Sequence, residues 1–242
     1  MTSSLPTIIA TSGGFISGRR NPIAYGPLIH YALERSGVEG RSPSICHIST
    51  ASGDQRYWQA NLDLAAKDAG VICSHLNLFP MPNVDDIESF LGDHDVIWVG
   101  GGSVANLLAI WRLHGLDEIM PRLWRSGKVL GGVSAGSICW HVGGTTDSFG
   151  PDLRVVDNGL SLLPYSNGVH YNSEPQRRPL FQSAISKGLL PDGYATDDGV
   201  GLVYVGTALE MAVSEVVGRF AYGVRKTEDG VVEEVIEPTS LI

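Results

Sequence analysis

A serine between two glycines is the residue best placed to act as a nucleophile. Gly132-Val133-Ser134-Ala135-Gly136 follows an apolar run that reads as a strand, and Ser137 to Trp140 read as the start of a helix. A tight turn between a strand and a helix needs small flanking residues, and it holds the serine hydroxyl above the edge of the sheet. The helix start also directs unpaired N–H groups toward the same point, where an oxyanion can be stabilised. The spacing predicts a nucleophile elbow, and a plain helix N-cap is the alternative for Ser134.

A serine hydroxyl needs a base, so one of the histidines must fold back to this edge. His170 is the candidate, because it lies toward the end of a short run, Gly168-Val-His-Tyr-Asn, that follows a segment rich in turns. Catalytic groups of open α/β sheets collect where strands end beside loops. The other six lie in predicted helices, strands or a charged turn, where a structural histidine is the expectation: His30, His47, His75, His94, His114 and His141.

The carboxylate that would orient the imidazole is expected in Asp197-Asp198-Gly199, directly before the apolar run Val200 to Tyr204. Neighbouring residues of an extended segment face opposite ways, so only one of the two aspartates can reach His170. The sequence leaves open which one. Glu174 and Glu210 are weaker candidates, and a solvated turn is the alternative role for the pair.

A second glycine turn, Gly100-Gly101-Gly102-Ser103, follows the run Val96 to Val99 and precedes another helical pattern. It resembles a dinucleotide-binding turn, in which a pyrophosphate rests on a helix N-terminus. Such a turn normally opens the fold, and an acid follows it at the end of the next strand about 20 residues on. Here Asp117 and Glu118 fall in a helical pattern instead. We therefore favour an oxyanion hole, in which the amide of Gly101 or Gly102 joins that of Ala135.

Strand-like and helical segments alternate through the first 140 residues, which predicts a parallel sheet with both faces covered by helices. The expected strands are 7–11, 45–49, 71–79, 96–99 and 129–133, and the expected helices cover 27–35, 54–69, 84–91 and 104–124. Short strands near 153–156, 168–171, 200–205 and 209–217 and a helix near 178–187 follow. The tail 220–236 alternates like an antiparallel hairpin that turns at Glu228-Asp229-Gly230. We predict one α/β domain, residues 1–242, with antiparallel strands at the C-terminal edge.

Composition narrows the classes of partner. The 242 residues carry 17 basic and 26 acidic side chains, a net charge of -9, so no basic field exists for a nucleic acid or an anionic membrane surface. No apolar run reaches the roughly 18 residues of a membrane helix, and no export signal is recognised. The three cysteines, Cys46, Cys73 and Cys139, form no CxxC pair, so neither disulfides nor a zinc site is expected. We expect a cytoplasmic protein.

Taken together, these motifs resemble peptidase family S51, the peptidase E or aspartyl dipeptidase group with its cyanophycinase relatives. The resemblance rests on the Val-Gly-Gly-Gly turn, the Gly-x-Ser-Ala-Gly elbow, Thr145-Thr146-Asp147, an isolated histidine and an acid followed by glycine, in this order along nearly the whole chain. It implies a fold similar to the glutaminase domains of class I amidotransferases. It also implies Ser134 as nucleophile, His170 as base and Asp198 as acid, at a place where the dipeptidases have a glutamate.

The resemblance carries further roles to this chain. The amides of Gly102 and Ala135 look like the oxyanion hole, and Asp147 matches an acid near the family's active site, where it would support the site or recognise an amine. Arg177 and Arg178 match a region where the dipeptidases hold the substrate carboxylate. Because Val133 stands where those enzymes have tryptophan, specificity for an N-terminal aspartate stays open.

The expected function is hydrolysis of short peptides through an acyl-enzyme, without a metal or organic cofactor. The expected partner is the peptide substrate, with no nucleic acid and no membrane, and a homodimer is an open alternative. A non-catalytic module that binds a nucleotide or small ligand is the second hypothesis. An esterase or amidase acting on other acyl groups is the third.

Overall fold

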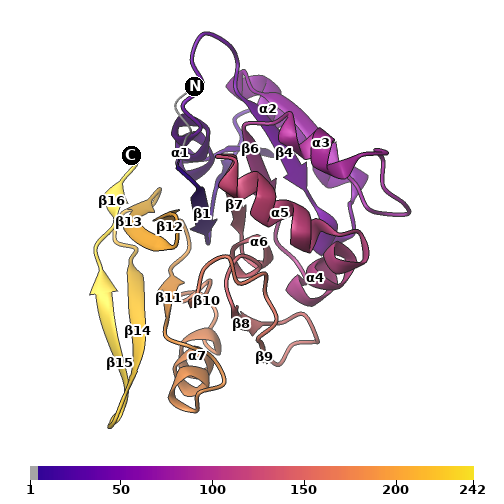
Figure 1. Ribbon diagram of the computed structural model, residues 1–242. Helices are drawn as coiled ribbons and strands as arrows, with labels where there is room; N and C mark the ends of the chain where they lie inside the picture. The colour runs from indigo at the N-terminus through magenta and orange to yellow at the C-terminus, as the bar shows by residue number, and fades with distance from the viewer. Residues whose placement is uncertain (1–4) are drawn as a thin grey trace.

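The computed structural model describes residues 5–242 and contains a large sheet flanked by helices (Figure 1). Its strand order is β16-β13-β12-β1-β7-β6-β4-β5. The central strands β1, β7, β6, β4 and β5 are mutually parallel, whereas β12 and β13 extend the sheet in antiparallel fashion. The strands are β1 (Thr7–Thr11), β4 (Ser44–Ile48), β5 (Ile72–Leu76), β6 (Val96–Val99), β7 (Val129–Val133), β12 (Val200–Val205), β13 (Ala208–Ser214) and β16 (Thr239–Ser240).

Helices cover both faces of this sheet, because its central strands are apolar on both sides. Within β6, neighbouring residues serve opposite faces: Ile97 packs in one hydrophobic cluster and Trp98 in another. Both clusters are buried, as a parallel sheet with helices on each face requires. The helical segments are α1 (Pro27–Arg35), η1 (Thr50–Ser52), α2 (Arg56–Ala69), α3 (Ile87–Gly92), α4 (Val104–Leu113), α5 (Leu116–Arg125), α6 (Ala135–Ile138) and α7 (Arg177–Ser186).

The predicted α/β class and the parallel sheet are confirmed. The five expected strands of the first 140 residues all form, and the helix expected over 27–35 has those bounds. The helical pattern over 104–124 is two helices, because Gly115 adopts a left-handed conformation with φ 73° and ends the continuity between α4 and α5. Within residues 5–242, none of the helices combines the length and hydropathy that crossing a bilayer requires.

A second sheet lies below the first in Figure 1 and was not expected from the sequence. Its order is β15-β14-β11-β10-β8-β9, and its strands β11, β10 and β8 are parallel neighbours. The expected hairpin forms as β14 and β15, but it belongs to this second sheet and not to the edge of the first. Its strands are β8 (Gly143–Thr146), β9 (Arg154–Val156), β10 (Ser166–Gly168), β11 (Gly193–Thr196), β14 (Ala221–Thr227) and β15 (Gly230–Ile236).

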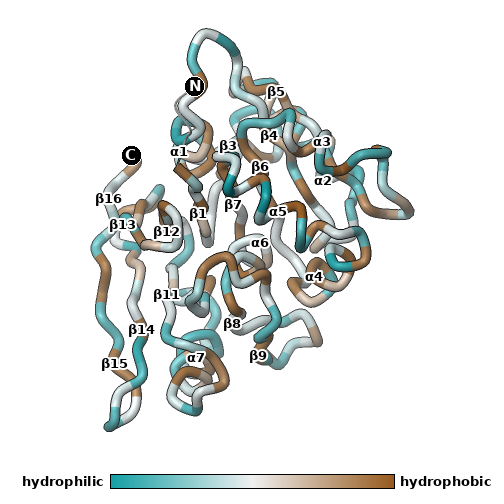
Figure 2. Tube along the Cα trace, viewed as in Figure 1, coloured by the Kyte–Doolittle hydropathy of each residue, from teal (hydrophilic) through white to brown (hydrophobic). Residues whose placement is uncertain are grey.

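The hairpin shows why the alternating tail was recognisable. Along β15 partly buried and exposed residues intermingle, and Figure 2 shows hydrophilic and hydrophobic stretches following one another along both of its strands. A short separate hairpin joins β2 (Phe15–Ser17) to β3 (Ile23–Tyr25), directly after β1. This hairpin places Phe15 just beyond the carboxyl end of β1.

The two sheets meet at the carboxyl ends of their parallel strands. Thr11, the last residue of β1, pairs with Val133 of β7 on one side and with Gly201 of β12 on the other. The chain passes from the end of β11 into β12 through Asp197, Asp198 and Gly199. Residues that follow β1, β6 and β7 of the first sheet therefore face residues that follow β8, β10 and β11 of the second.

Candidate functional site

Ser134 occupies a strained turn at the carboxyl end of β7. Its backbone angles, φ 58° and ψ -110°, lie in a region that residues with side chains rarely adopt. Its N–H donates to Thr11 O at 3.0 Å, and its carbonyl accepts from Ser137 and Ile138 as α6 begins. The strained backbone is thus held by β1 on one side and by the helix on the other.

The flanking glycines are required by close backbone approach. A Cβ on Gly136 would lie 2.1 Å from the carbonyl oxygen of Val99, and one on Gly132 would lie 2.5 Å from that of Gly136. Both distances are far below a van der Waals contact, so a side chain at either position would displace the turn. This crowding explains why glycine stands on both sides of Ser134 in the sequence.

The glycine turn after β6 lies directly against Ser134. The Cβ position of Gly101 is 3.4 Å from Ser134 Cβ and 3.9 Å from its Oγ. Gly102 has φ 131°, and a Cβ there would lie 2.4 Å from Ala51 O. Among residues 5–242, no acceptor receives the amides of Gly101, Gly102 or Ala135. These amides are therefore available to a ligand oxygen beside Ser134.

His170 and Asp198 form the central side-chain pair of the site. His170 Nδ1 lies 2.6 Å from Asp198 Oδ1, a short hydrogen bond that leaves Nε2 to face other groups. The half-buried imidazole side chain is 24% exposed and the carboxylate 42%. His170 lies just past the end of β10, not within it, and its φ is 53°, so it shares with Ser134 a backbone conformation that is rare outside glycine.

Asp197 is turned the other way, into the second sheet. Its carboxylate is buried and accepts hydrogen bonds from the Phe220 N–H at 3.1 Å and the Tyr222 hydroxyl at 3.3 Å. Its own N–H donates to Phe220 O. His170 is therefore paired with Asp198, whereas Asp197 bonds residues at the start of β14. The two aspartates point in opposite directions, as neighbouring residues of an extended segment do.

The backbone N–H groups of Ser134 and His170 donate to two consecutive residues, Thr11 at the end of β1 and Ser12 directly after it. Ser134 donates to Thr11 O, and the His170 N–H donates to Ser12 Oγ at 3.1 Å. The Ser12 carbonyl also accepts from Gly199 N at 2.9 Å, directly after Asp198. Two consecutive residues, Thr11 at the end of β1 and Ser12 directly after it, therefore hold the serine, the imidazole and the loop of the carboxylate.

Sequence reasoning missed the residues that anchor this arrangement. Ser12 Oγ also lies 2.7 Å from Thr196 Oγ1, and Asn172 Oδ1 accepts from the Asp198 N–H at 2.7 Å. Glu215 accepts from the amides of Gly14 and Leu28, and burial raises the pKa of its carboxyl. No local motif marks these residues, since each acts on a segment distant in the chain.

Two other histidines are unsuited to act as a base. Burial holds the pKa of His141 at about 4, although its Nδ1 lies 2.9 Å from Ser137 O. Burial and the neighbouring His75 lower the pKa of His47 to about 3, and its Nε2 bonds Tyr25 OH at 2.6 Å. Both rings stay neutral and fully enclosed, as expected for structural histidines.

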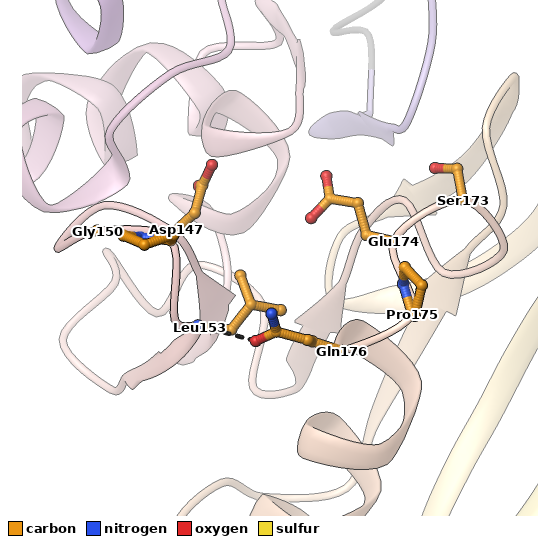
Figure 3. Close-up of a pocket in the computed structure, with 8 residues that line it drawn as sticks. Asp147, Gly150, Leu153, Ser173, Glu174, Pro175 and Gln176 are labelled. Atoms are coloured by element: carbon orange, nitrogen blue, oxygen red, sulfur yellow. Dashed lines mark hydrogen bonds between the residues drawn. The ribbon is translucent and has the colours of Figure 1, made fainter.

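Asp147 follows β8 and lines an open cavity of about 420 Å³ with Ser173 and Glu174 (Figure 3). Figure 3 shows the carboxyl groups of Asp147 and Glu174 extending from separate loops, with Leu153 and Gln176 between them. The Leu153 N–H donates to Gln176 Oε1 at 3.3 Å at the base of this cavity. Asp147 is largely exposed, so it is accessible to a ligand.

The two arginines expected near the substrate are engaged within the chain. Arg177 is only 3% exposed; its Nε lies 2.7 Å from Glu174, its Nη1 2.6 Å from Thr145 O and its Nη2 3.8 Å from Asp147. Arg178 pairs with Glu233 and stacks over the rings of Tyr171 and Tyr222. The structure therefore places Arg177 beneath the cavity wall and Arg178 in an ion pair on β15.

Within the part of the chain that the structure describes, one group of side chains could hold a metal ion. The ligand atoms of Asp63, Cys73 and His75 all lie within 4.8 Å of one another, at the β5 edge of the first sheet. Asp63 and His75 are already paired at 2.8 Å. In the strand order, β6 and β4 lie between β7 and β5, so this group is separate from Ser134.

Comparison with known proteins relates this chain to peptidases. The profile of Peptidase family S51 matches residues 8–212. An "Uncharacterized peptidase YgaJ" of Bacillus subtilis (strain 168) is 39% identical over 226 residues, which cover 93% of this chain and 95% of that protein. A "Peptidase E" of Shewanella denitrificans is 26% identical over 160 residues, or 61% of this chain and 66% of that protein.

Solved structures share the fold at low sequence identity. A peptidase from an acI-B1 Actinobacterium superposes with a TM-score of 0.68 at 15% identity, over 98% of this chain and 96% of that one. A putative peptidase E protein from Listeria monocytogenes EGD-e gives a TM-score of 0.56 at 16% identity, over 96% and 100% of the two chains. Both neighbours have the architecture described above.

Proposed function

The chain belongs to peptidase family S51, and from this premise we propose that it is a serine peptidase that hydrolyses short peptides through an acyl-enzyme. Ser134 is the nucleophile, His170 the general base and Asp198 the residue that orients the imidazole. The amides of Gly102 and Ala135 stabilise the oxyanion. The proposed reaction uses no metal or organic cofactor.

In the proposed reaction, Ser134 Oγ attacks the carbonyl carbon of the scissile peptide bond while His170 Nε2 accepts its proton. The carbonyl oxygen becomes an oxyanion and receives hydrogen bonds from the two amides. His170 then donates the proton to the departing amine, which leaves an ester on Ser134. Water, activated by the same imidazole, releases the acid and restores the serine.

The hydrogen bond between His170 and Asp198 is the observation that carries this proposal. It fixes Nδ1 as the donor, so Nε2 is left as the acceptor that a serine proton requires. The partner carboxylate comes from a different loop, 28 residues further along, so this hydrogen bond is a tertiary contact that the Gly-x-Ser-x-Gly motif itself does not contain. The hydrogen bonds of Ser134 to Thr11 and of His170 to Ser12 also support the proposal, because they bring the serine and the histidine to neighbouring residues.

Dipeptides with an N-terminal aspartate are one substrate class that the family suggests. The residues expected to receive that carboxylate, Arg177 and Arg178, are paired with acidic residues of the chain itself. An incoming carboxylate would have to replace an existing ion pair at either position. We therefore propose short peptides as the substrate class without a requirement for aspartate.

The test is hydrolysis of a panel of dipeptides and tripeptides by the wild-type protein and by Ser134→Ala. The variant is expected to lose about 10⁵- to 10⁶-fold in kcat, because the covalent step disappears while the fold remains. A variant that keeps more than a few per cent of the turnover would overturn the mechanism. Thermal unfolding of both proteins controls for folding.

Two further candidates give different outcomes in the same assays. A ligand-binding module would cleave nothing and would be stabilised against heat by nucleotides. The contact between Gly101 and Ser134 disfavours this, since the glycine turn adjoins the serine rather than standing free. An esterase or amidase would show Ser134-dependent cleavage of non-peptide acyl groups with no turnover of peptides.

A further inference from the structure

A second cavity, of about 490 Å³, opens beside Ser134 and has no role in the chemistry proposed above. Its walls come from the start of β2, from the ends of β6 and β7, and from the η1 and α2 region that follows β4. The wall residues that bear on its function are Phe15, Gln55, Tyr57, Trp58, Gly101 and Val133.

The cavity begins at the reacting serine. Val133 precedes Ser134 in the chain, and the Cβ position of Gly101 is 3.4 Å from Ser134 Cβ. The same glycine turn offers the free amide of Gly102 to the oxyanion. A substituent next to the carbonyl carbon that Ser134 attacks can therefore extend into this cavity while the carbonyl stays within reach of the serine.

The walls are aromatic and uncharged. Phe15 packs edge-on against Trp58 with ring centroids 5.6 Å apart, so these two wall residues support each other. Tyr57 is 74% exposed, so a large apolar surface is presented to solvent at the first turn of α2. The remaining polar wall residues, Ser52 and Gln55, are neutral. A carboxylate bound here would lose hydration without meeting an opposite charge.

The position of the cavity assigns it to one side of the scissile bond. The leaving amine must lie near His170, which donates its proton and is held by Ser12 after β1. In the sheet order, β1 and β12 lie on one side of β7, whereas β6 and β4 lie on the other. Most walls of the cavity follow β6 and β4, so it adjoins the acyl portion of the substrate.

We propose that this cavity binds the side chain of the residue whose carbonyl is attacked, and that it selects an apolar side chain, aromatic or large aliphatic, over an acidic one. This inference rests on the proposed function, because it needs Ser134 as the nucleophile. Phe15, Tyr57 and Trp58 are the specificity-determining residues, and the bound side chain lies among their rings.

The test uses two boronic acids, which add reversibly to a reactive serine and need no known substrate. One carries a phenylethyl group and the other a carboxyethyl group of similar length. The phenylethyl compound is expected to inhibit at least about tenfold more tightly, the range that one apolar group contributes in a hydrophobic pocket. Equal or tighter inhibition by the carboxyethyl compound would overturn the inference.

Variants locate the preference in the cavity. Tyr57→Ala is expected to weaken inhibition by the phenylethyl compound about fivefold to tenfold and to leave the carboxyethyl compound almost unchanged. Leu113→Ala is the matched control, because Leu113 is 75% exposed but lies at the far end of α4, and no change is expected. An unchanged preference in Tyr57→Ala would contradict the assignment.

A gain of function gives a second, independent readout. Gln55 makes no side-chain cap hydrogen bond before α2, so Gln55→Arg adds a cation to the wall without removing a helix cap. It is expected to raise the ratio of carboxyethyl to phenylethyl affinity by about tenfold. An unchanged ratio would contradict the proposed position of the cavity.

Different results would contradict the cavity assignment and the proposed peptidase function. If Ser134 is phosphonylated by a fluorophosphonate and peptides are cleaved, but selectivity follows neither Tyr57 nor Gln55, the cavity assignment is wrong and the peptidase stands. If Ser134 stays unmodified and no peptide or boronic acid is recognised, the proposed function fails and the assignment fails with it.

Discussion

The two sides of Ser134, called flanks below, are lined by different kinds of chemical group. On the β1 and β12 flank, polar side chains are fixed by hydrogen bonds: Ser12 holds His170, Asn172 holds the Asp198 amide, and Asp198 holds the imidazole. On the β6 and β4 flank, backbone amides that have no acceptor among the described residues 5–242 adjoin a cavity walled by aromatic rings. The first flank is suited to moving a proton and the second to holding a substrate.

This difference indicates how such a site can keep its chemistry while its specificity changes. Proton transfer depends on positions correct to within a hydrogen bond, and so its residues are tied to one another. Recognition of a substrate side chain in an apolar cavity depends on the volume of the cavity and on how much water it holds. Substitution of an exposed residue such as Tyr57 can alter both without disturbing the polar flank. Substitutions on the polar flank should accordingly change kcat, and substitutions on the aromatic flank should change selectivity.

The sharpest test of the polar flank is a pair of neighbouring substitutions. Asp198→Asn should reduce kcat by about 10³-fold or more, since an amide no longer fixes the tautomer of His170. Asp197→Asn should keep most activity and lower the melting temperature, because Asp197 accepts from Phe220 and Tyr222 and does not contact His170. Steady-state kinetics and thermal unfolding of both variants measure this, and the reverse outcome would exchange the two roles.

The glycine turn can be tested on the other flank. Gly102→Ala should reduce kcat by about 10²- to 10³-fold, because the added Cβ would meet Ala51 O at 2.4 Å and displace an oxyanion donor. Gly92→Ala, at the end of α3, is the control, since its Cβ would lie 3.8 Å from the nearest atom, an ordinary contact. Equal losses in both variants would argue against an oxyanion role for this turn.

A smaller effect is expected from the residue that positions the imidazole without touching it. Ser12→Ala removes the acceptor of the His170 N–H and should lower kcat about tenfold, with KM little changed. The split between kcat and KM distinguishes positioning from substrate binding. Ser12→Thr keeps the hydroxyl and should recover part of the loss, and a KM effect alone would contradict this role.

The smallest effect is expected far from both flanks. Burial alone would raise the pKa of Asp95, but hydrogen bonds from Arg41 and Ser44 outweigh it and lower the pKa from 3.8 to about 2. Asp95 therefore stabilises the fold above pH 4, and this contribution is lost as the pH falls toward 2. After allowance for solvent screening, Asp95→Asn should lower the free energy of unfolding by about 1 kcal/mol at pH 7.

Denaturant unfolding of wild-type protein and Asp95→Asn between pH 2 and pH 7 measures this difference. The gap in unfolding free energy should close as the pH approaches 2, and the kcat of the variant should equal that of the wild type at pH 7. A gap that is constant across this range would show that lost packing, not the carboxylate charge, causes the destabilisation.

Local patterns predicted much of the first sheet and the elbow. Apolar runs gave strands β1, β4, β6 and β7 because parallel strands buried on both faces are apolar throughout. The glycines around Ser134 were informative because backbone crowding excludes side chains there. Both signals are contained in a few adjacent residues, so they can be recognised without knowledge of the tertiary fold.

The hairpin β14–β15 and the strand β9 of the second sheet had local signals, but the parallel strands that join them and the cavity did not. β8 is Gly143-Gly144-Thr145-Thr146 and β10 is Ser166-Asn167-Gly168, which are short and lack an apolar run. Tyr57 and Trp58 begin an ordinary helix, and their position beside Gly101 results from the crossover after β4. The choice between Asp197 and Asp198 likewise depends on β14, which lies more than 20 residues further along the chain.

The most direct test of the account is the rate and place of fluorophosphonate labelling. Wild-type protein should be modified stoichiometrically, with the added mass on the peptide that contains Ser134, and His170→Ala should react at least about 10³-fold more slowly because no base takes the proton. Modification of a different residue, or an unchanged rate in His170→Ala, would contradict a serine nucleophile activated by His170.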